Sequence, residues 1–147
     1  MQMREIKFRG KRKDNNEWIY GSLWIRREAD TSWLKCYICE KFDDEWHEII
    51  PETVGQFIDL KIKNVKEIYE GDEVKCSISK TQHYKGYVLY EDGHFYIQTF
   101  WYRFRPTGRW DLQKPPLSGR CNTKLDIRNT INEVIGTIHD NPEILEK

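Results

Sequence analysis

Apolar and polar residues alternate with a period of two along much of this chain. Every second residue is apolar in the segments 6–9, 34–38 and 74–78. Successive side chains of a strand point to opposite faces of a sheet, so this period predicts half-buried strands. Further strands are predicted at 18–20, 86–90, 95–104 and 134–138. A long apolar stripe with the 3.6-residue period of a helix is missing, and we therefore expect a mainly β fold.

Turn signals separate the predicted strands. Asp14-Asn15-Asn16 predicts a turn between two strands, and Glu91-Asp92-Gly93 predicts a hairpin turn. Glycine accepts a positive φ and aspartate can hydrogen-bond the nearby backbone, so Gly71-Asp72 predicts a tight turn that leads into a small β-barrel. Asn141-Pro142-Glu143 predicts an N-cap followed by proline, and hence a short terminal turn or helix.

The predicted strand over 95–104 is apolar on both faces. Phe95, Ile97, Thr99 and Trp101 share one face, whereas Tyr96, Phe100, Tyr102 and Phe104 share the other. Such a strand must be covered on both sides. The second cover is the chain's own second layer, another subunit or a ligand. The segment 105–122, rich in proline and glycine, predicts a long loop.

Charge is balanced over the chain but unevenly distributed. The 147 residues, enough for one domain or two small subdomains, include 24 Lys and Arg against 24 Asp and Glu. Residues 1–13 hold six basic residues against one acidic residue, and residues 40–52 hold six acidic residues against one basic residue. These segments are either solvated faces or opposite patches that meet within one chain or between subunits.

The N-terminus and the cysteines indicate a cytoplasmic protein. The first residues are charged throughout, unlike a signal peptide, and no apolar run approaches the roughly 20 residues of a membrane span. Four cysteines lie at 36, 39, 76 and 121. Cys36 and Cys39 form a CxxC that, with Cys76 and Cys121, has the ligand number of a zinc site. Three residues apart on a strand, however, they point to opposite faces, so we expect reduced free thiols and no metal site.

Motifs of catalysis and of cofactor binding are missing from the sequence. It contains no G-x-S-x-G, no phosphate-binding loop and no dinucleotide fingerprint. His47 lies in the acidic run 43–48, whose spacing lacks the pattern of a calcium loop, and we interpret that run as a solvated turn. We therefore expect neither an enzyme nor a cofactor, with a metal-dependent hydrolase as a distant alternative.

Aromatic and basic residues interleave near the end of the doubly apolar strand. The predicted binding surface consists of Trp101, Arg103, Arg105, Arg109 and Trp110. Rings on a strand can stack unpaired bases while arginines hold phosphates. The alternative is that the rings belong to the core and the arginines pair with acidic residues, which agrees with the zero net charge.

Three blocks of the sequence resemble the YopX family of phage and prophage proteins. They are 4–23, 51–75 and 133–145, in the order that the family shows. The family-motif residues, taken as structural, are Pro51, Glu52, Thr53, Gly55, Tyr69, Gly71, Asp72, Gly136, Asn141 and Pro142. The chain departs from the usual motif at 58–59 and 62–65, where Val65 replaces the glycine of the common Asn-Gly turn. The resemblance implies a mostly β fold with a small-barrel component, encoded by a virus or prophage, and no assigned reaction.

Taken together, these patterns predict a mainly β fold. We expect a small β-barrel, SH3-like in part, with additional antiparallel hairpins and at most short helices. A single YopX-like domain spans 1–147, with a possible division into N-terminal hairpins, 1–50, and a barrel-like part, 51–147. The expected function is non-catalytic binding in the bacterial host cytoplasm, through protein–protein interaction or self-association. Binding of single-stranded nucleic acid or RNA is the alternative, and no membrane contact is expected.

Overall fold

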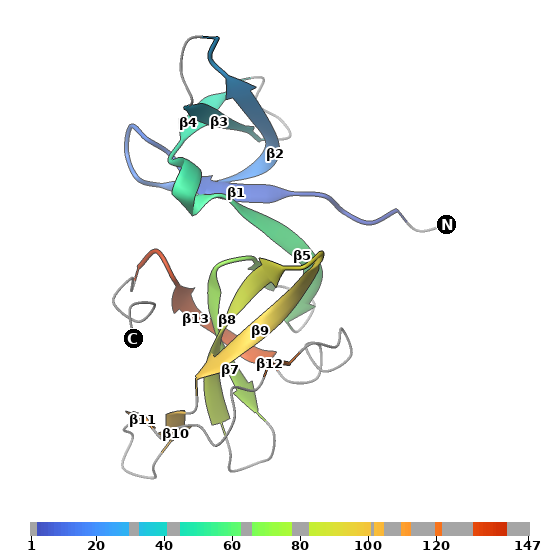
Figure 1. Cartoon of the computed structure of the whole chain (residues 1–147), viewed down its shortest axis with the longest axis vertical. Helices are drawn as coiled ribbons and strands as arrows, with labels where there is room; N and C mark the ends of the chain where they lie inside the picture. Colours follow the sequence, from blue (N-terminus) through green and yellow to red (C-terminus); the bar gives the residue numbers. More distant parts are fainter. Residues whose placement is uncertain are drawn as a thin grey trace. The chain divides into compact units, whose positions relative to one another are not determined.

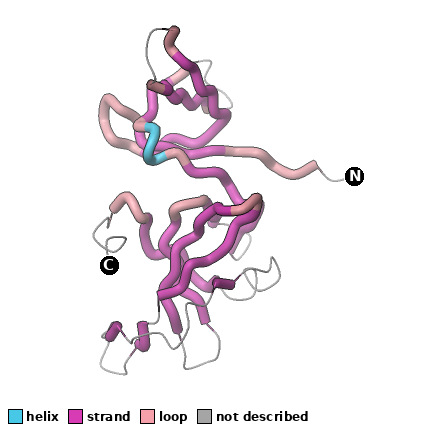
Figure 2. The backbone as a smooth tube through the Cα atoms, viewed as in Figure 1, coloured by secondary structure: helices cyan, strands magenta, loops and turns pink. Residues whose placement is uncertain are grey.

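The chain is organised as two compact units built almost entirely of antiparallel strands. A computed structural model describes residues 3–29, 33–40, 45–62, 66–77, 83–100, 102–104, 110–112, 120–121 and 131–140. The units are Met1–Asp59 and Leu60–Lys147. Within the described ranges the helical element is one short 3-10 helix (Figure 2). The mainly β class predicted from the period-two alternation is therefore confirmed.

The first unit is a curled antiparallel sheet. It contains β1 (Phe8–Lys11), β2 (Trp18–Arg27), β3 (Leu34–Cys39), β4 (His47–Ile49), the 3-10 helix η1 (Pro51–Thr53) and the start of β5 (Gly55–Ile62). These strands belong to a six-stranded sheet of order β4-β3-β2-β1-β5-β6, in which β6 (Lys66–Tyr69) belongs to the second unit (Figure 1). The predicted turn between β1 and β2 is confirmed, since Asn16 has a φ of 60° and its N–H donates to the Arg12 carbonyl at 2.9 Å.

The edge strand β4 also contacts the end of strand β1. Arg12, just after β1, forms an isolated antiparallel bridge with Ile49 of β4. The N–H of Lys13 donates to the carbonyl of Glu48, and the N–H of Ile50 donates to the carbonyl of Lys11, both at 2.9 Å. Strand β4 therefore has backbone partners on two sides, β3 and the end of β1.

One face of the first unit's strands supplies its core. The buried residues Ile19, Cys36, Ile38 and Ile49 form this core, and Phe8, Leu23 and Val54 pack against it. Cross-strand pairs such as Leu23 with Ile38 and Cys36 with Ile49 lie on this face. The intervening residues of each strand point away from the core, as the two-residue period requires.

The second unit contains a five-stranded sheet and a separate strand pair. After the end of β5, its strands are β6 (Lys66–Tyr69), β7 (Asp72–Ser77), β8 (His83–Glu91), β9 (His94–Phe100), β10 (Tyr102–Phe104), β11 (Trp110–Leu112), β12 (Arg120–Cys121) and β13 (Ile131–Thr137). The sheet order is β12-β9-β8-β7-β13, while β10 pairs with β11. Strand β13 includes most of the strand predicted at 134–138.

Two predicted turns of this unit have the expected geometry. Asp92 and Gly93 join β8 to β9 with φ values of 52° and 83°, which is the two-residue hairpin with positive φ at both central positions. Gly71 has a φ of 85°, and the side chain of Asp72 accepts a 2.8 Å hydrogen bond from the N–H of Tyr69. Both turns are confirmed, and in the second the side chain of Asp72 accepts the predicted kind of backbone hydrogen bond.

The segment predicted as one strand over 95–104 has different partners along its length. Strand β9 pairs with β8 and β12, whereas β10 pairs with β11. Apolar and polar residues alternate in the same way in both strands, so the pattern could not show this change of partner. Tyr96 and Ile97 are neighbours on opposite faces and both are buried, so β9 is covered on both sides. The predicted loop 105–122 contains two short strands, β11 and β12, and in that respect the loop prediction was wrong.

The predicted N-cap at 141–143 lies outside the described residues. Among those that the structure describes, no helix is both long enough and apolar enough to cross a bilayer.

Candidate functional site

Three aromatic rings gather on the outward face of the first unit. Strand pairing places Trp24 directly opposite Tyr37, with their ring centroids 5.5 Å apart. Trp46, just before β4, lies edge-on to Trp24 at 5.8 Å. Trp24 is 47% exposed and Trp46 is 44% exposed. These three residues, here called the aromatic cluster, present large apolar surfaces to solvent.

The end of the β2–β3 hairpin exposes apolar side chains on its other face as well. Ile25 pairs with Cys36, so it lies on the face that carries the core. Ile25 is nevertheless 53% exposed, and Leu34, which pairs with Arg27 on the same face, is 47% exposed. We call Trp24–Arg27 together with Leu34–Tyr37 the hairpin end. It carries exposed apolar residues on both faces.

Basic residues accompany these apolar groups at the hairpin end. Arg26 and Arg27 are exposed. Lys35 pairs with Glu28 at 2.7 Å, and this hydrogen bond raises the pKa of Lys35 and lowers the pKa of Glu28. The hairpin end is therefore apolar and cationic together.

A further aromatic residue on the same outward face, Trp18, is flanked by cations. The guanidinium of Arg9 lies 4.7 Å from the ring centre of Trp18, and the ammonium of Lys11 lies 5.2 Å from it. Strand pairing places Arg9 opposite Tyr20 and Lys11 opposite Trp18. All four side chains therefore share one face of the β1–β2 pair.

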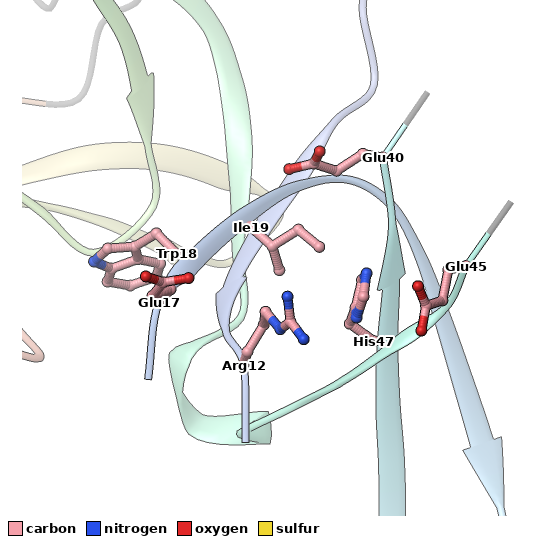
Figure 3. A pocket seen from close by; sticks show the side chains of 7 residues that line it. All are labelled: Arg12, Glu17, Trp18, Ile19, Glu40, Glu45 and His47. Carbon is pink, nitrogen blue, oxygen red and sulfur yellow. The ribbon is translucent and has the colours of Figure 1, made fainter. Parts of the chain in front are cut away.

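A polar hollow of about 360 Å³ opens near the start of β2. We call it the Arg12 pocket, and its lining residues are Arg12, Glu17, Trp18, Ile19, Glu40, Glu45 and His47. Figure 3 shows the Arg12 guanidinium between Ile19 and His47, with the carboxylate of Glu45 beside His47. Strands β2 and β4 and the segments that flank β1, β3 and β4 supply these side chains.

Carboxylates dominate the charge of this pocket. Arg12 donates two hydrogen bonds to the carboxylate of Asp14, at 3.0 and 2.5 Å. That pairing raises the pKa of Arg12 and lowers the pKa of Asp14, and the charges of Glu17 and Glu45 raise the pKa of Arg12 further. Because Asp14 balances the charge of Arg12, the carboxylates of the lining leave the pocket acidic.

The two oppositely charged segments meet within the chain. Lys13 of the basic segment forms an ion pair with Glu48 of the acidic segment, with a nitrogen–oxygen distance of 2.9 Å. The backbone hydrogen bond between the same residues brings them together. At this point, the interpretation in which the patches meet within one chain is the correct one.

His47, interpreted from the sequence as part of a solvated turn, instead begins β4 and is half-buried.

The cysteines have the strand geometry that the sequence predicted. Cys36 pairs with Ile25 and Cys39 with Ser22, which places the two thiols on opposite faces of β3. Cys36 is buried, and desolvation raises the pKa of its thiol. Cys36, Cys39 and Cys76 are free thiols, and no group of three potential metal ligands occurs among the described residues.

The predicted aromatic and basic surface falls largely beyond the described part of the chain. Trp101, Arg105 and Arg109 lie outside the described residues. The backbone of Arg103 pairs with Asp111, and that of Trp110 pairs with Phe104. The pairing of β10 with β11 thus brings two of the five predicted positions onto adjacent strands, and the surface itself stays a prediction.

The family-motif residues occur mainly at turns and strand ends. The structure describes Pro51, Glu52, Thr53, Gly55, Tyr69, Gly71, Asp72 and Gly136, whereas Asn141 and Pro142 lie outside the described residues. The hydroxyl of Thr53 accepts a 2.8 Å hydrogen bond from the N–H of Lys11, and Gly55 pairs with Arg9. Gly136 lies at a register shift between β13 and β7. Their contacts fix turns and strand pairing.

Sequence reasoning missed both the aromatic cluster and the Arg12 pocket. The available signal was the distribution of tryptophan, since four of the six tryptophans lie within the first 46 residues. The interior of a small unit has too little volume to enclose this many large rings, so some of them lie at the surface. The pocket had no comparable signal, because its residues come from four separate segments.

Comparison with known proteins identifies the family. No curated protein matches the chain. A family model described as YopX protein matches residues 7–146, nearly the whole length. The resemblance predicted from the three sequence blocks is confirmed, and the chain belongs to the YopX family.

Proposed function

We propose that this protein is a non-catalytic, phage- or prophage-encoded module that binds another protein in the host cytoplasm. The observation that carries the proposal is the hairpin end, with Trp24 exposed on one face and Ile25 and Leu34 exposed on the other. Exposed large apolar residues that gather on one element can mark a contact site. An element apolar on both faces suits insertion between two surfaces of a partner.

The composition of the hairpin end agrees with a protein contact. Tryptophan, tyrosine and arginine are the residues that most often dominate binding energy at interfaces. Complete burial of one large apolar side chain contributes about 1.5–3 kcal/mol. Trp24, Ile25 and Leu34 are each about half exposed, so roughly half of that contribution is still to be gained on docking.

We also propose that the protein has a small, SH3-like β-barrel component. The sequence predicted this component within 51–147, but the support comes from the first unit, where the strand order β4-β3-β2-β1 is complemented by the bridge between Arg12 and Ile49. The two backbone hydrogen bonds around that bridge bring the edge strand back to the first strand. A barrel presents its outward side chains on a rigid support, which favours a preorganised contact surface.

Photo-crosslinking in the host cytoplasm tests the proposed function. A photoreactive phenylalanine derivative replaces Trp24 in one variant and Tyr90, an exposed aromatic residue of β8, in the matched control. We expect a discrete crosslinked protein, identified by mass spectrometry, from position 24 and not from position 90. Equal or absent crosslinking at the two positions would contradict a contact at the hairpin end.

Binding of single-stranded nucleic acid is the second candidate function. The observation that favours it is Trp18 beneath the cationic groups of Arg9 and Lys11, on the same face as the exposed Tyr20. An aromatic residue beside a cation can stack a base while the cation contacts phosphate, and Lys11, unlike the buried Arg9, is partly exposed for that contact. Titration of a labelled oligonucleotide at two salt concentrations tests it, and affinity should fall with salt and with Trp18→Ala. Binding insensitive to both changes would contradict it.

A further inference from the structure

We propose that the hairpin end docks onto a second copy of this chain, with Arg27 of each copy entering the Arg12 pocket of the other. This inference rests on the proposed function and names its partner. The two surfaces involved belong to the first unit, so one two-fold axis can bring both pairs of surfaces together.

The charges of the two surfaces are complementary. The hairpin end carries the exposed guanidinium of Arg27 on the face with Ile25 and Leu34, and that of Arg26 on the opposite face. The Arg12 pocket is lined by the carboxylates of Glu17, Glu40 and Glu45, all exposed. Arginine is suited to such a site because its planar guanidinium can donate paired hydrogen bonds to carboxylates.

The pocket's own cation does not offset this complementarity. Both hydrogen bonds recorded for the Arg12 guanidinium end on the carboxylate of Asp14. That pair is neutral as a whole, and the lining further contains the carboxylates of Glu17, Glu40 and Glu45.

The size and lining of the pocket fit one arginine side chain. Its volume of about 360 Å³ lies at the lower end of the range of small-ligand sites, roughly 300–1,000 Å³. Its lining is mostly polar and includes the carboxylates of Glu17, Glu40 and Glu45, which are the acceptors that a guanidinium requires.

The face of the hairpin end that carries Arg27 is also the face with unexplained apolar exposure. Arg27 pairs with Leu34, and Ile25 lies two residues earlier on the same strand, so the three side chains share this face. Entry of Arg27 into a pocket would cover Ile25 and Leu34, which are 53% and 47% exposed. One contact therefore accounts for both the charge pattern and the exposed apolar groups.

The geometry of β2 excludes the same contact within one copy. Ile19 in the pocket and Arg27 lie at opposite ends of the strand, eight residues apart and hence about 26 Å apart at about 3.3 Å per residue. Two copies with antiparallel β2 strands would place each Arg27 near the Ile19 of the other copy. The contact is thus intermolecular and reciprocal.

Sedimentation velocity with charge-reversed variants of the full chain tests the inference. We expect the wild-type chain to form a dimer whose dissociation constant rises with salt. Arg26→Glu combined with Arg27→Glu, and separately Glu40→Lys combined with Glu45→Lys, should each weaken the dimer about tenfold or more. Glu133→Lys, at an exposed position of β13 in the second unit, is the matched control and should leave the dimer unchanged.

Mixing the two double variants gives the decisive measurement. In a one-to-one mixture, the glutamates of one variant face the lysines of the other, and the native arginines face the native glutamates. Association should therefore return, although each variant alone sediments as a monomer. Circular dichroism of each variant, unchanged from wild type, excludes loss of fold as the cause.

The outcomes also separate this inference from the proposed function. A wild-type chain that stays monomeric at all concentrations, or a mixture that fails to associate, overturns docking of a second copy. A dimer that withstands both charge reversals overturns the role of the Arg12 pocket. In each of these cases, specific crosslinking of a different protein at position 24 would leave the proposed function standing.

Discussion

Gly21 approaches the neighbouring strand more closely than any residue with a side chain can. A Cβ atom at this position would overlap the backbone carbonyl of Cys39, which cannot rotate away. Gly21→Ala should therefore push β2 from β3 and lower the free energy of unfolding by about 1–3 kcal/mol. Urea denaturation measures the loss, with Ser22→Ala at the adjacent exposed position as the control. A loss no larger than that of the control would contradict the close approach.

The carboxylate of Asp72 closes the turn between β6 and β7 from a buried position. It is 1% exposed and accepts the 2.8 Å hydrogen bond from the Tyr69 N–H. Asp72→Ala removes the acceptor and leaves a buried donor behind, so the free energy of unfolding should fall by about 1–3 kcal/mol. Asp92→Asn, in the exposed turn between β8 and β9, keeps a residue that tolerates positive φ and should be nearly neutral. Equal effects of the two substitutions in thermal unfolding would disprove this role.

The thiol of Cys36 should show the consequence of its burial in its pH dependence. Desolvation raises the pKa of this thiol, so its reactive thiolate is scarcer at pH 8 than that of an ordinary cysteine. Stability contributed by the neutral thiol is present at neutral pH and is lost as pH rises through the raised pKa. Mass spectrometry after brief iodoacetamide treatment at pH 8 should find Cys39, which is only half-buried, modified before Cys36. Equal rates at the two cysteines would contradict the effect.

At the scale of elements, the hairpin end combines a stable cross-strand pair with an exposed surface. Trp24 and Tyr37 face each other across β2 and β3 at 5.5 Å, and such ring pairs contribute about 0.5–1.5 kcal/mol beyond area burial. Trp24→Leu should lower stability by about that amount and reduce the near-ultraviolet circular dichroism of the cluster. Trp33→Leu, at a 75% exposed position, is the control and should leave the stability unchanged. Identical stability of the wild type, Trp24→Leu and Trp33→Leu would show that the Trp24–Tyr37 ring pair contributes nothing to stability.

Elements were predictable where their signals were local. The turns at Asn16, Gly71 and Gly93 depend on residues that accept positive φ, and the strands depend on alternation between neighbours. The change of pairing partner between β9 and β10 was not predictable, because the alternation is the same in both strands. The Arg12 pocket depends on pairing between the end of β1 and β4, more than 35 residues apart. A single sequence does not indicate which residues of two such distant segments lie opposite each other.

At the scale of the whole molecule, each unit should respond to changes in its own interior. Ile38 is fully buried in the core of the first unit, and Val88 is fully buried in the second. Ile38→Ala should lower the stability of its unit by about 2–5 kcal/mol. Hydrogen exchange should then accelerate in 8–56 and stay unchanged in 66–97, and Val88→Ala should produce the reverse pattern. Acceleration throughout the chain in both variants would show that the units unfold together.

Strand β1 lies between β2 and β5, and Phe8 is paired with both Gly21 and Gln56. The polypeptide thus enters and leaves the first unit at adjacent points. A segment with neighbouring ends can be spliced into a surface loop of an unrelated carrier without stretching either protein. We expect that residues 7–57 can be inserted into a carrier in this way and that the inserted segment keeps its exposed tryptophans as a binding surface.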